Sequence, residues 1–183
     1  MTTATQTLTD VYQADPVHSS FGFAVTYQGI STFRGTFDEV AATLAPAADG
    51  DLQLDGRAKV ESISIRQPEA FRVHVLSDEF FGAESHPEVV FESTTADLAE
   101  DGGATIEGTL TIKGIAKPVV ARGSWRALEA DAFGRKRAHL ALEAVVNRHD
   151  YKMEWNAPLP NGGQALADDV TIIVDLSLIA AEA

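Results

Sequence analysis

Apolar and polar residues alternate with a period of two along most of the chain. In Ser19–Thr26 the odd positions carry Phe21, Phe23 and Val25, whereas the even positions carry small or polar residues. Because successive side chains of a strand point to opposite faces, this alternation predicts a strand with one buried face, as in antiparallel sheets. Three further segments alternate in the same way: Ala104–Ile112, Ala138–Asn147 and Val170–Ala180.

Two segments change the phase of their alternation midway. The apolar positions are odd in Phe33–Phe37 but even in Val40–Leu44, and they are even in Leu52–Val60 but odd in Ile63–Ile65. A shift of one residue turns the buried face of a strand outward, so we expect β-bulges to absorb both changes. Bulges also let long strands bend around a closed barrel.

Short turns separate the strands, and helix is scarce. Lys113-Gly114 joins two strand segments as a two-residue hairpin turn does, and Ala45–Gly50 is typical of a longer hairpin loop. We expect one or two short helices near residues 68–81 and a helical turn near residues 148–152. About eight long strands without crossover helices predict an all-β fold, a single antiparallel up-and-down barrel.

The 183 residues suit one domain, and no linker or internal repeat divides them. We expect a flexible N-terminal segment over residues 1–10 and a single barrel domain over residues 11–183. No segment approaches the length of a membrane span, and the first ten residues lack the pattern of a secretory signal. These features predict a cytoplasmic protein without integral membrane association.

The interior of such a barrel is either packed or hollow. At about eight strands the lumen is just wide enough to fill with side chains or to hold one small ligand. Small residues among large aromatic ones either fit a taper or leave a channel, and the pattern alone favours neither. The small residues at the inferred inward positions are Gly35, Ala42, Gly56, Ala58, Gly108, Ala121 and Gly123.

Charge and composition exclude several classes of function. The chain has 14 Lys and Arg residues against 27 Asp and Glu residues, a net charge of −13. Such an acidic surface repels phosphate backbones, which argues against nucleic-acid binding and against docking on anionic lipid. The absence of cysteine excludes disulfides, thiol catalysis and thiolate metal sites.

Catalytic and cofactor motifs are missing as well. The five histidines are widely spaced and form no metal-ligand motif, and no hydrolase or nucleotide-binding motif occurs. His149-Asp150 is a candidate acid–base pair, but adjacent side chains rarely point the same way, which favours a structural turn. We therefore expect no metal, no cofactor and no catalytic residues.

Several blocks of sequence stand in a fixed order from about Tyr12 to Ala180. The most specific block runs from Ser77–Phe81 to His86–Ser93. In this order the blocks resemble the YceI-like family, lipocalin-like barrels that bind polyisoprenoids or similar long apolar chains. The other matching blocks are Asp15–Ser19 with Phe21 and Phe23, Gly29–Ser31, Gly35–Phe37, Gly108–Gly114, Lys117–Val119, Asn147-Arg148, Asp150-Tyr151 and Asp169-Val170.

The chain departs from the family pattern at four places. Tyr27 stands where a histidine is common, and Lys152 replaces a usual glycine. Ile65-Arg66 replaces a Thr-Gly pair, and Phe71-Arg72 replaces an Arg-Asp pair ahead of His74. Three of these departures lie near the helical segment that we expect at the mouth of the barrel.

The resemblance implies a hollow barrel and a binding function. It implies non-catalytic binding, storage or transport of a long-chain apolar ligand, such as an isoprenoid, an isoprenoid quinone or a fatty-acyl compound. Arg72, His74 and Arg148 are candidates for contact with a polar headgroup. The candidates for the apolar lining are Phe21, Phe23, Phe33, Phe37, Phe71, Val75, Phe80, Phe91, Trp125 and Trp155.

Two other functions stay open at this point. An enzyme acting on an apolar small molecule inside the barrel needs a polar group with a shifted pKa in the lumen, and His74 or Tyr151 are the candidates. A packed interaction module without a ligand needs a barrel without a continuous cavity. The oligomeric state is also open, with a homodimer as one option.

Overall fold

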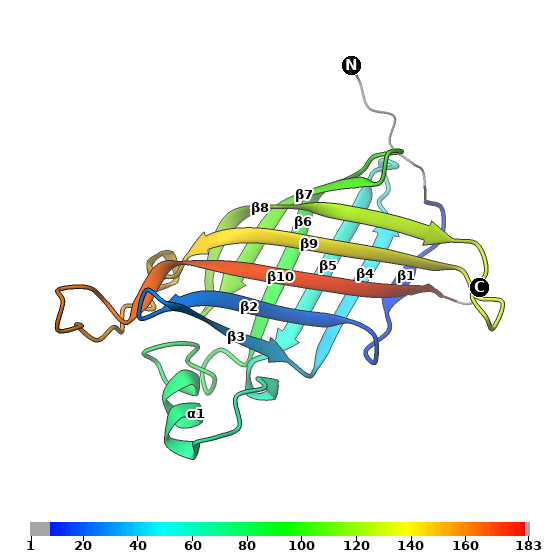
Figure 1. The fold of residues 1–183 in the computed structure, drawn as a ribbon. Helices are drawn as coiled ribbons and strands as arrows, with labels where there is room; N and C mark the ends of the chain where they lie inside the picture. The colour runs from blue at the N-terminus through cyan, green and yellow to red at the C-terminus, as the bar shows by residue number, and fades with distance from the viewer. Residues whose placement is uncertain (1–7, 182–183) are drawn as a thin grey trace.

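Ten strands form one antiparallel sheet that curves into a barrel (Figure 1) in a computed structural model that describes residues 8–181. The order of hydrogen-bonded neighbours is β1-β4-β5-β6-β7-β8-β9-β10-β2-β3, and β1 also pairs with β10. The strands are β1 (Tyr12–Ala14), β2 (Ser20–Tyr27), β3 (Ser31–Phe37), β4 (Val40–Pro46), β5 (Leu52–Lys59), β6 (Glu88–Leu98), β7 (Gly103–Ile112), β8 (Ile115–Leu128), β9 (Arg137–Asn147) and β10 (Leu166–Ala180).

The long strand β10 closes the barrel. One of its edges pairs with β9, and the other pairs first with β2 over Leu166–Asp175 and then with β1 over Leu178–Ala180. In turn, β2 pairs with β3, and β1 pairs with β4. Hence β1 and β2 share one position in the wall and β3 and β4 the next, so that the ten strands close an eight-stranded barrel. The predicted all-β up-and-down barrel is confirmed.

Both changes of alternation phase fall at interruptions of a strand. The first lies at Asp38-Glu39, between β3 and β4, and the second lies in the 3-10 helix η1 (Val60–Ser62) that follows β5. The expected β-bulges at these two places are therefore wrong, because a break in the strand changes the inward face without a bulge. Register shifts occur instead between Ser93 and Thr95 in β6 and between Leu166 and Val170 in β10.

The helical segments and the tightest turn lie where the sequence predicts them. Helix α1 (Glu69–Leu76) lies outside the sheet beside β3 (Figure 1), and the 3-10 helix η2 (Arg148–Tyr151) follows β9. Ser77–Phe81 forms a turn rather than a second helix. Lys113 and Gly114 have φ values of 53° and 69°, as a two-residue hairpin with positive φ at both central positions requires.

One end of the barrel is solid. Its core contains Leu44, Leu98, Leu140 and Leu178, each 0% exposed, together with Trp125, whose indole N–H donates to the carbonyl of Ala99 (2.7 Å). Leu8, the first described residue, packs into this core, so the polypeptide contacts the barrel from residue 8 onward. Of the segment expected to be flexible, residues 1–7 lie outside the described part of the chain. We call this part of the barrel, which the core residues above fill, the closed end.

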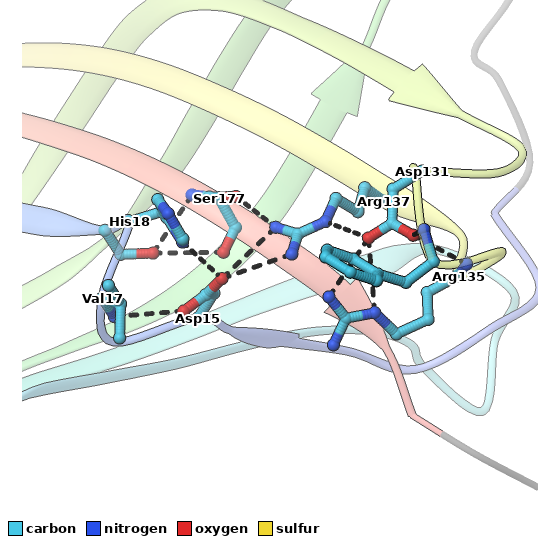
Figure 2. A network of polar contacts seen from close by, with 9 residues as sticks. Asp15, Val17, His18, Asp131, Arg135, Arg137 and Ser177 are labelled. Carbon is cyan, nitrogen blue, oxygen red and sulfur yellow. Dashed lines mark hydrogen bonds and ion pairs between the residues drawn. The ribbon is translucent and has the colours of Figure 1, made fainter.

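A network of charges ties the loops of the closed end together (Figure 2). The Arg137 guanidinium donates to Asp131 (2.7 Å), to the Ser177 hydroxyl (2.9 Å) and to Asp15 (3.3 Å). Asp15 also accepts a hydrogen bond from the His18 ring (2.8 Å). The hydrogen bond from Arg137 is the main cause that holds the pKa of Asp131 well below its usual range. Since Asp131 stays ionised, the link between the β8–β9 loop and the wall persists at neutral pH.

The helices of the described residues 8–181 are too short or too polar to cross a membrane.

Candidate ligand cavity

The other half of the barrel is hollow. A cavity of about 590 Å³ extends from the closed end to α1 and η2, and its walls are the inward faces of the strands. Pockets that bind small molecules typically measure roughly 300–1,000 Å³. We call the end of the barrel beside α1 and η2 the mouth.

The cavity ends at a layer of hydrocarbon side chains. This floor consists of the residues that both line the cavity and belong to the core of the closed end. Each of them is at most 6% exposed. The floor residues are Ala42, Leu54, Ile106, Leu142 and Leu176.

The lumen stays open because phenylalanine rings lean over glycines of the wall. Gly35 lies opposite Phe23 in the pairing of β2 with β3, and a Cβ atom at Gly35 would lie 2.6 Å from the tip of the Phe23 ring. A Cβ atom at Gly108 would lie 2.7 Å from the Phe91 ring and even closer to the backbone carbonyl oxygen of Glu92. Only glycine leaves room for a ring at these distances, so these aromatic residues cover the wall instead of filling the lumen.

Aromatic rings of α1, the following turn and the segment after η2 meet at the mouth. The His74 ring contacts the rings of Phe80 (centroids 5.1 Å apart) and Trp155 (4.9 Å), and Phe80 and Trp155 contact each other (5.6 Å). All three residues line the cavity. Lys113 donates to the carbonyls of Asp78 (2.6 Å) and Lys152 (3.1 Å), which joins the same segments beside the rings.

Arg148 is a buried cation beside the cavity. It is 4% exposed, and its guanidinium donates to the carbonyls of Ala167 (2.9 Å), Met153 (2.5 Å) and Trp155 (2.8 Å). Its Nη2 atom makes no hydrogen bond and lies 3.6 Å from an oxygen of Asp168. The main role of this side chain is to hold the segment after η2 against the start of β10.

The backbone at Lys152 explains the glycine that the family usually has there. Lys152 ends η2 with φ 56° and ψ 35°, the left-handed region that glycine adopts without steric cost. Its amide donates to the carbonyl of His149 (2.9 Å), which ends the helical turn. The helical turn η2 therefore ends in the same way with a lysine at this position as it would with glycine.

Two titratable groups next to Arg148 have shifted pKa values. The His149 ring donates to Asp168 (2.8 Å) and to Glu154 (2.7 Å), and these two hydrogen bonds, that of Asp168 first, raise the pKa of His149. Burial raises the pKa of Tyr151 to about 12. Its hydroxyl donates to the carbonyl of Leu110 at 3.4 Å, so the phenol is neutral and engaged at neutral pH.

The structure places most of the predicted lining residues at the cavity. The residues that line it are Phe21, Phe23, Phe33, Phe37, Phe71, Val75, Phe80, Phe91 and Trp155. Trp125 does not, because its ring belongs to the core of the closed end. Of the three headgroup candidates, His74 and Arg148 border the cavity. Arg72 does not, because its guanidinium donates to the carbonyls of η1 and the segment after it, including Glu61 at 2.6 Å.

Sequence reasoning missed part of the lining. Phe81 contacts the rings of both Phe23 (6.2 Å) and Phe37 (5.7 Å), and Met153, which follows η2, also lines the cavity. The even apolar positions of β10, such as Ile172 and Val174, also border the cavity. The alternation in β10 predicts these positions, whereas Phe81 lies in a turn and Met153 in an irregular segment, where periodicity carries no information.

The polar groups of the lining offer little chemistry. The His74 ring donates to Glu79 (2.6 Å), and the Tyr151 hydroxyl is held by a backbone carbonyl. Within residues 8–181 no three His, Asp or Glu side chains gather in a geometry that holds a metal ion. The packed-module hypothesis is wrong, because half of the barrel is hollow.

Fold and cavity together define a lipocalin-like barrel that is closed at one end and apolar inside. The chain belongs to the YceI-like domain family, which matches residues 12–178. A UPF0312 protein of Staphylococcus aureus strain N315 is 28% identical over 162 residues, which cover 85% of this chain and 90% of the relative. A UPF0312 protein of Pseudomonas syringae pv. tomato is 25% identical over 156 residues, 84% of this chain and 79% of the relative.

Solved structures share the fold at lower identity. BcnA of Burkholderia cenocepacia superposes with a TM-score of 0.72 at 18% identity, over 92% of this chain and 99% of that one. A polyisoprenoid binding domain from Saccharophagus degradans, implicated in plant cell wall breakdown, has a TM-score of 0.66 at 12% identity, over 93% of this chain and 98% of that one. These similarities confirm the barrel architecture.

Proposed function

We propose that this protein binds a long-chain apolar ligand in the barrel and stores or transports it without chemical change. The observation that carries the proposal is the preformed cavity of about 590 Å³ with an almost wholly hydrocarbon lining. An isoprenoid, an isoprenoid quinone or a fatty-acyl chain has the shape and polarity that this lining accepts. The polyisoprenoid binding domain with the same fold supports the proposal.

Apolar burial supplies enough free energy for such binding. Each methylene group moved from water into an apolar site contributes about 0.8 kcal/mol. A chain of about ten carbons therefore gains roughly 8 kcal/mol, against several kcal/mol of lost translational and rotational freedom. Because the walls are already in place, little further ordering of the protein opposes binding.

The state of the polar groups favours binding over catalysis. A catalytic group needs a free acid, base or nucleophile that faces the substrate. His74 and Tyr151 are instead engaged with Glu79 and a backbone carbonyl. We infer that they shape the mouth and the wall.

Organic extraction of the purified protein followed by mass spectrometry tests the proposal. We expect a stoichiometric apolar compound in the extract, or uptake of a fluorescent fatty acid by the delipidated protein. A clean extract together with no uptake by a folded preparation refutes the proposal.

A charge in the lumen provides a second test. Phe21→Asp places a carboxylate among hydrocarbon groups, so we expect it to abolish uptake of the fluorescent fatty acid. Val145→Asp is the control, because Val145 is 64% exposed on a strand that also lines the cavity. Equal uptake by the two variants contradicts the assignment of the inward face.

A further inference from the structure

We propose that the protonated ring of His149 is a pH-sensitive latch at the mouth of the barrel, and that the ligand exchanges faster once the ring has lost its proton. The inference rests on the proposed binding function and adds a means of regulating it. The part that the latch holds is residues 152–157, which we call the mouth segment. Trp155 of this segment lines the cavity and contacts the rings of His74 and Phe80.

His149 joins the mouth segment to the barrel wall through two carboxylates. Its Nδ1 atom lies 2.7 Å from an oxygen of Glu154 in the mouth segment, and its Nε2 atom lies 2.8 Å from an oxygen of Asp168 near the start of β10. A neutral imidazole has one N–H group, whereas an imidazolium has two. Both hydrogen bonds therefore form only when the ring is protonated. After loss of the proton, one ring nitrogen turns its lone pair toward a carboxylate oxygen, which repels it.

Among the histidines of residues 8–181, His149 alone bridges two carboxylates. His18, His74 and His139 each pair with a single carboxylate. A neutral ring keeps such a single hydrogen bond, because it donates from the nitrogen that faces the carboxylate. His149 is thus the histidine whose pairing depends on its protonation state.

The charged groups around His149 favour its protonated form. Asp168 on β10 acts first and Glu154 in the mouth segment second, and these two carboxylates raise the pKa of His149. Burial and the Arg148 cation on η2 oppose protonation but do not outweigh the carboxylates. Since the pKa is raised, the latch is closed below the ordinary value of 6.5 and opens at a higher pH.

Loss of the proton loosens the mouth segment without detaching it. Arg148 donates to the carbonyls of Met153 (2.5 Å) and Trp155 (2.8 Å), and its charge persists at every pH at which the protein is studied. The group that becomes free is the side chain of Glu154. Because Trp155 follows it directly in the chain, the indole ring gains freedom to move away from the rings at the mouth.

Release of a pyrene-labelled long-chain alcohol from the delipidated and reloaded full chain tests the latch, because this probe has no titratable group. Stopped-flow fluorescence measures the rate constant of release into an excess of phosphatidylcholine vesicles between about pH 5.5 and about pH 9. We expect the rate constant to rise about two- to fivefold with pH, since an ion pair between exposed groups contributes little. His149→Asn should release the probe at the high-pH rate of the parent throughout. A parent without pH dependence, or a His149→Asn variant that retains it, overturns the latch.

Two further variants separate the latch from other effects of pH. Glu154→Gln removes the charge that ties down the mouth segment, and this side chain is 69% exposed, so we expect the variant to fold and to lose most of the pH dependence. His86→Asn is the control and should keep the dependence of the parent, because His86 forms no ion pair within residues 8–181. The latch is wrong if Glu154→Gln keeps the full dependence or if His86→Asn abolishes it.

Acrylamide quenching of tryptophan fluorescence tests the latch without a ligand. Trp125 is 4% exposed in the core of the closed end, so quenching reports mainly on Trp155. We expect the quenching constant of the parent to rise with pH and that of His149→Asn to stay constant. If the probe does not bind but quenching changes in this way, the proposed binding function fails and the latch stands. If quenching of the parent is independent of pH, the latch fails whatever the probe does.

Discussion

Replacement of Gly35 by alanine tests how the lumen is kept open. Gly35 is buried in β3, and its φ lies in the ordinary range, so alanine fits the backbone. The added Cβ atom would lie 2.6 Å and 2.7 Å from two atoms of the Phe23 ring. The ring is bordered on its sides by Phe33, Phe37 and Phe81 at centroid distances of 6.1–6.3 Å, so it has room only toward the cavity.

The expected magnitude follows from these distances. Carbon atoms in contact lie about 3.5–4.0 Å apart, so the ring has to retreat by about 1 Å. We estimate that this movement removes the volume of about one methylene group from the lumen, which weakens ligand binding about fourfold. Overpacking of this kind also lowers the free energy of unfolding, by about 1–3 kcal/mol.

Gly56→Ala is the control for this experiment. Its Cβ atom would lie 3.4 Å and 3.5 Å from the Phe21 ring, an ordinary contact, so we expect Kd within twofold of the parent. Displacement of a fluorescent fatty acid measures Kd, and urea denaturation measures the free energy of unfolding. If Gly35→Ala binds like the parent, or if the two variants weaken binding equally, the rings do not keep the lumen open.

Three further predictions concern the charged groups. The stabilisation from His149 is complete below its ordinary pKa of 6.5 and is lost as the pH rises through its raised pKa. We therefore expect His149→Asn to lower the melting temperature more at about pH 5.5 than at about pH 9. The pKa of Asp131 is lowered, so its stabilisation is present above the ordinary value of 3.8 and is lost as the pH falls. Urea denaturation should show Asp131→Asn to be destabilised at neutral pH and closer to the parent in acid. Arg148→Met leaves three backbone carbonyls without a donor, so we expect a loss of roughly 3 kcal/mol in the free energy of unfolding.

Each of these predictions has a matched comparison. His86→Asn is the control for His149, because His86 forms no ion pair with a described residue, and equal pH dependence in the two variants contradicts the assignment. If the loss of free energy of unfolding in Asp131→Asn stays the same from neutral pH down to about pH 3, the assignment for Asp131 is wrong. Arg66→Met is the control for Arg148→Met, because it removes an exposed cation that is paired with Asp38. We expect it to change the free energy of unfolding by no more than roughly 1 kcal/mol. An equally small loss in Arg148→Met refutes a structural role for the buried guanidinium.

Local signals in the sequence predict the parts of the barrel that depend on local chemistry. The alternation in Ser19–Thr26 and Val170–Ala180 predicts which side chains face inward, because a strand has only two faces. Lys113-Gly114 predicts its hairpin, because few residues tolerate positive φ. The phase changes predict a local irregularity but not its kind, since a bulge and a strand break have the same effect on the pattern.

Only the tertiary structure decides how the ends of the barrel differ. Trp125 and Phe23 have equivalent patterns in the sequence, yet one ring lies in the solid core and the other borders the cavity. The difference arises from the pairing of the strands, because the register of β2 with β3 sets Gly35 opposite Phe23 and gives the ring a place against the wall. The alternating sequence by itself determines a closed wall with an apolar interior. Whether that interior holds side chains or a ligand depends on which residues, distant in sequence, the register brings face to face.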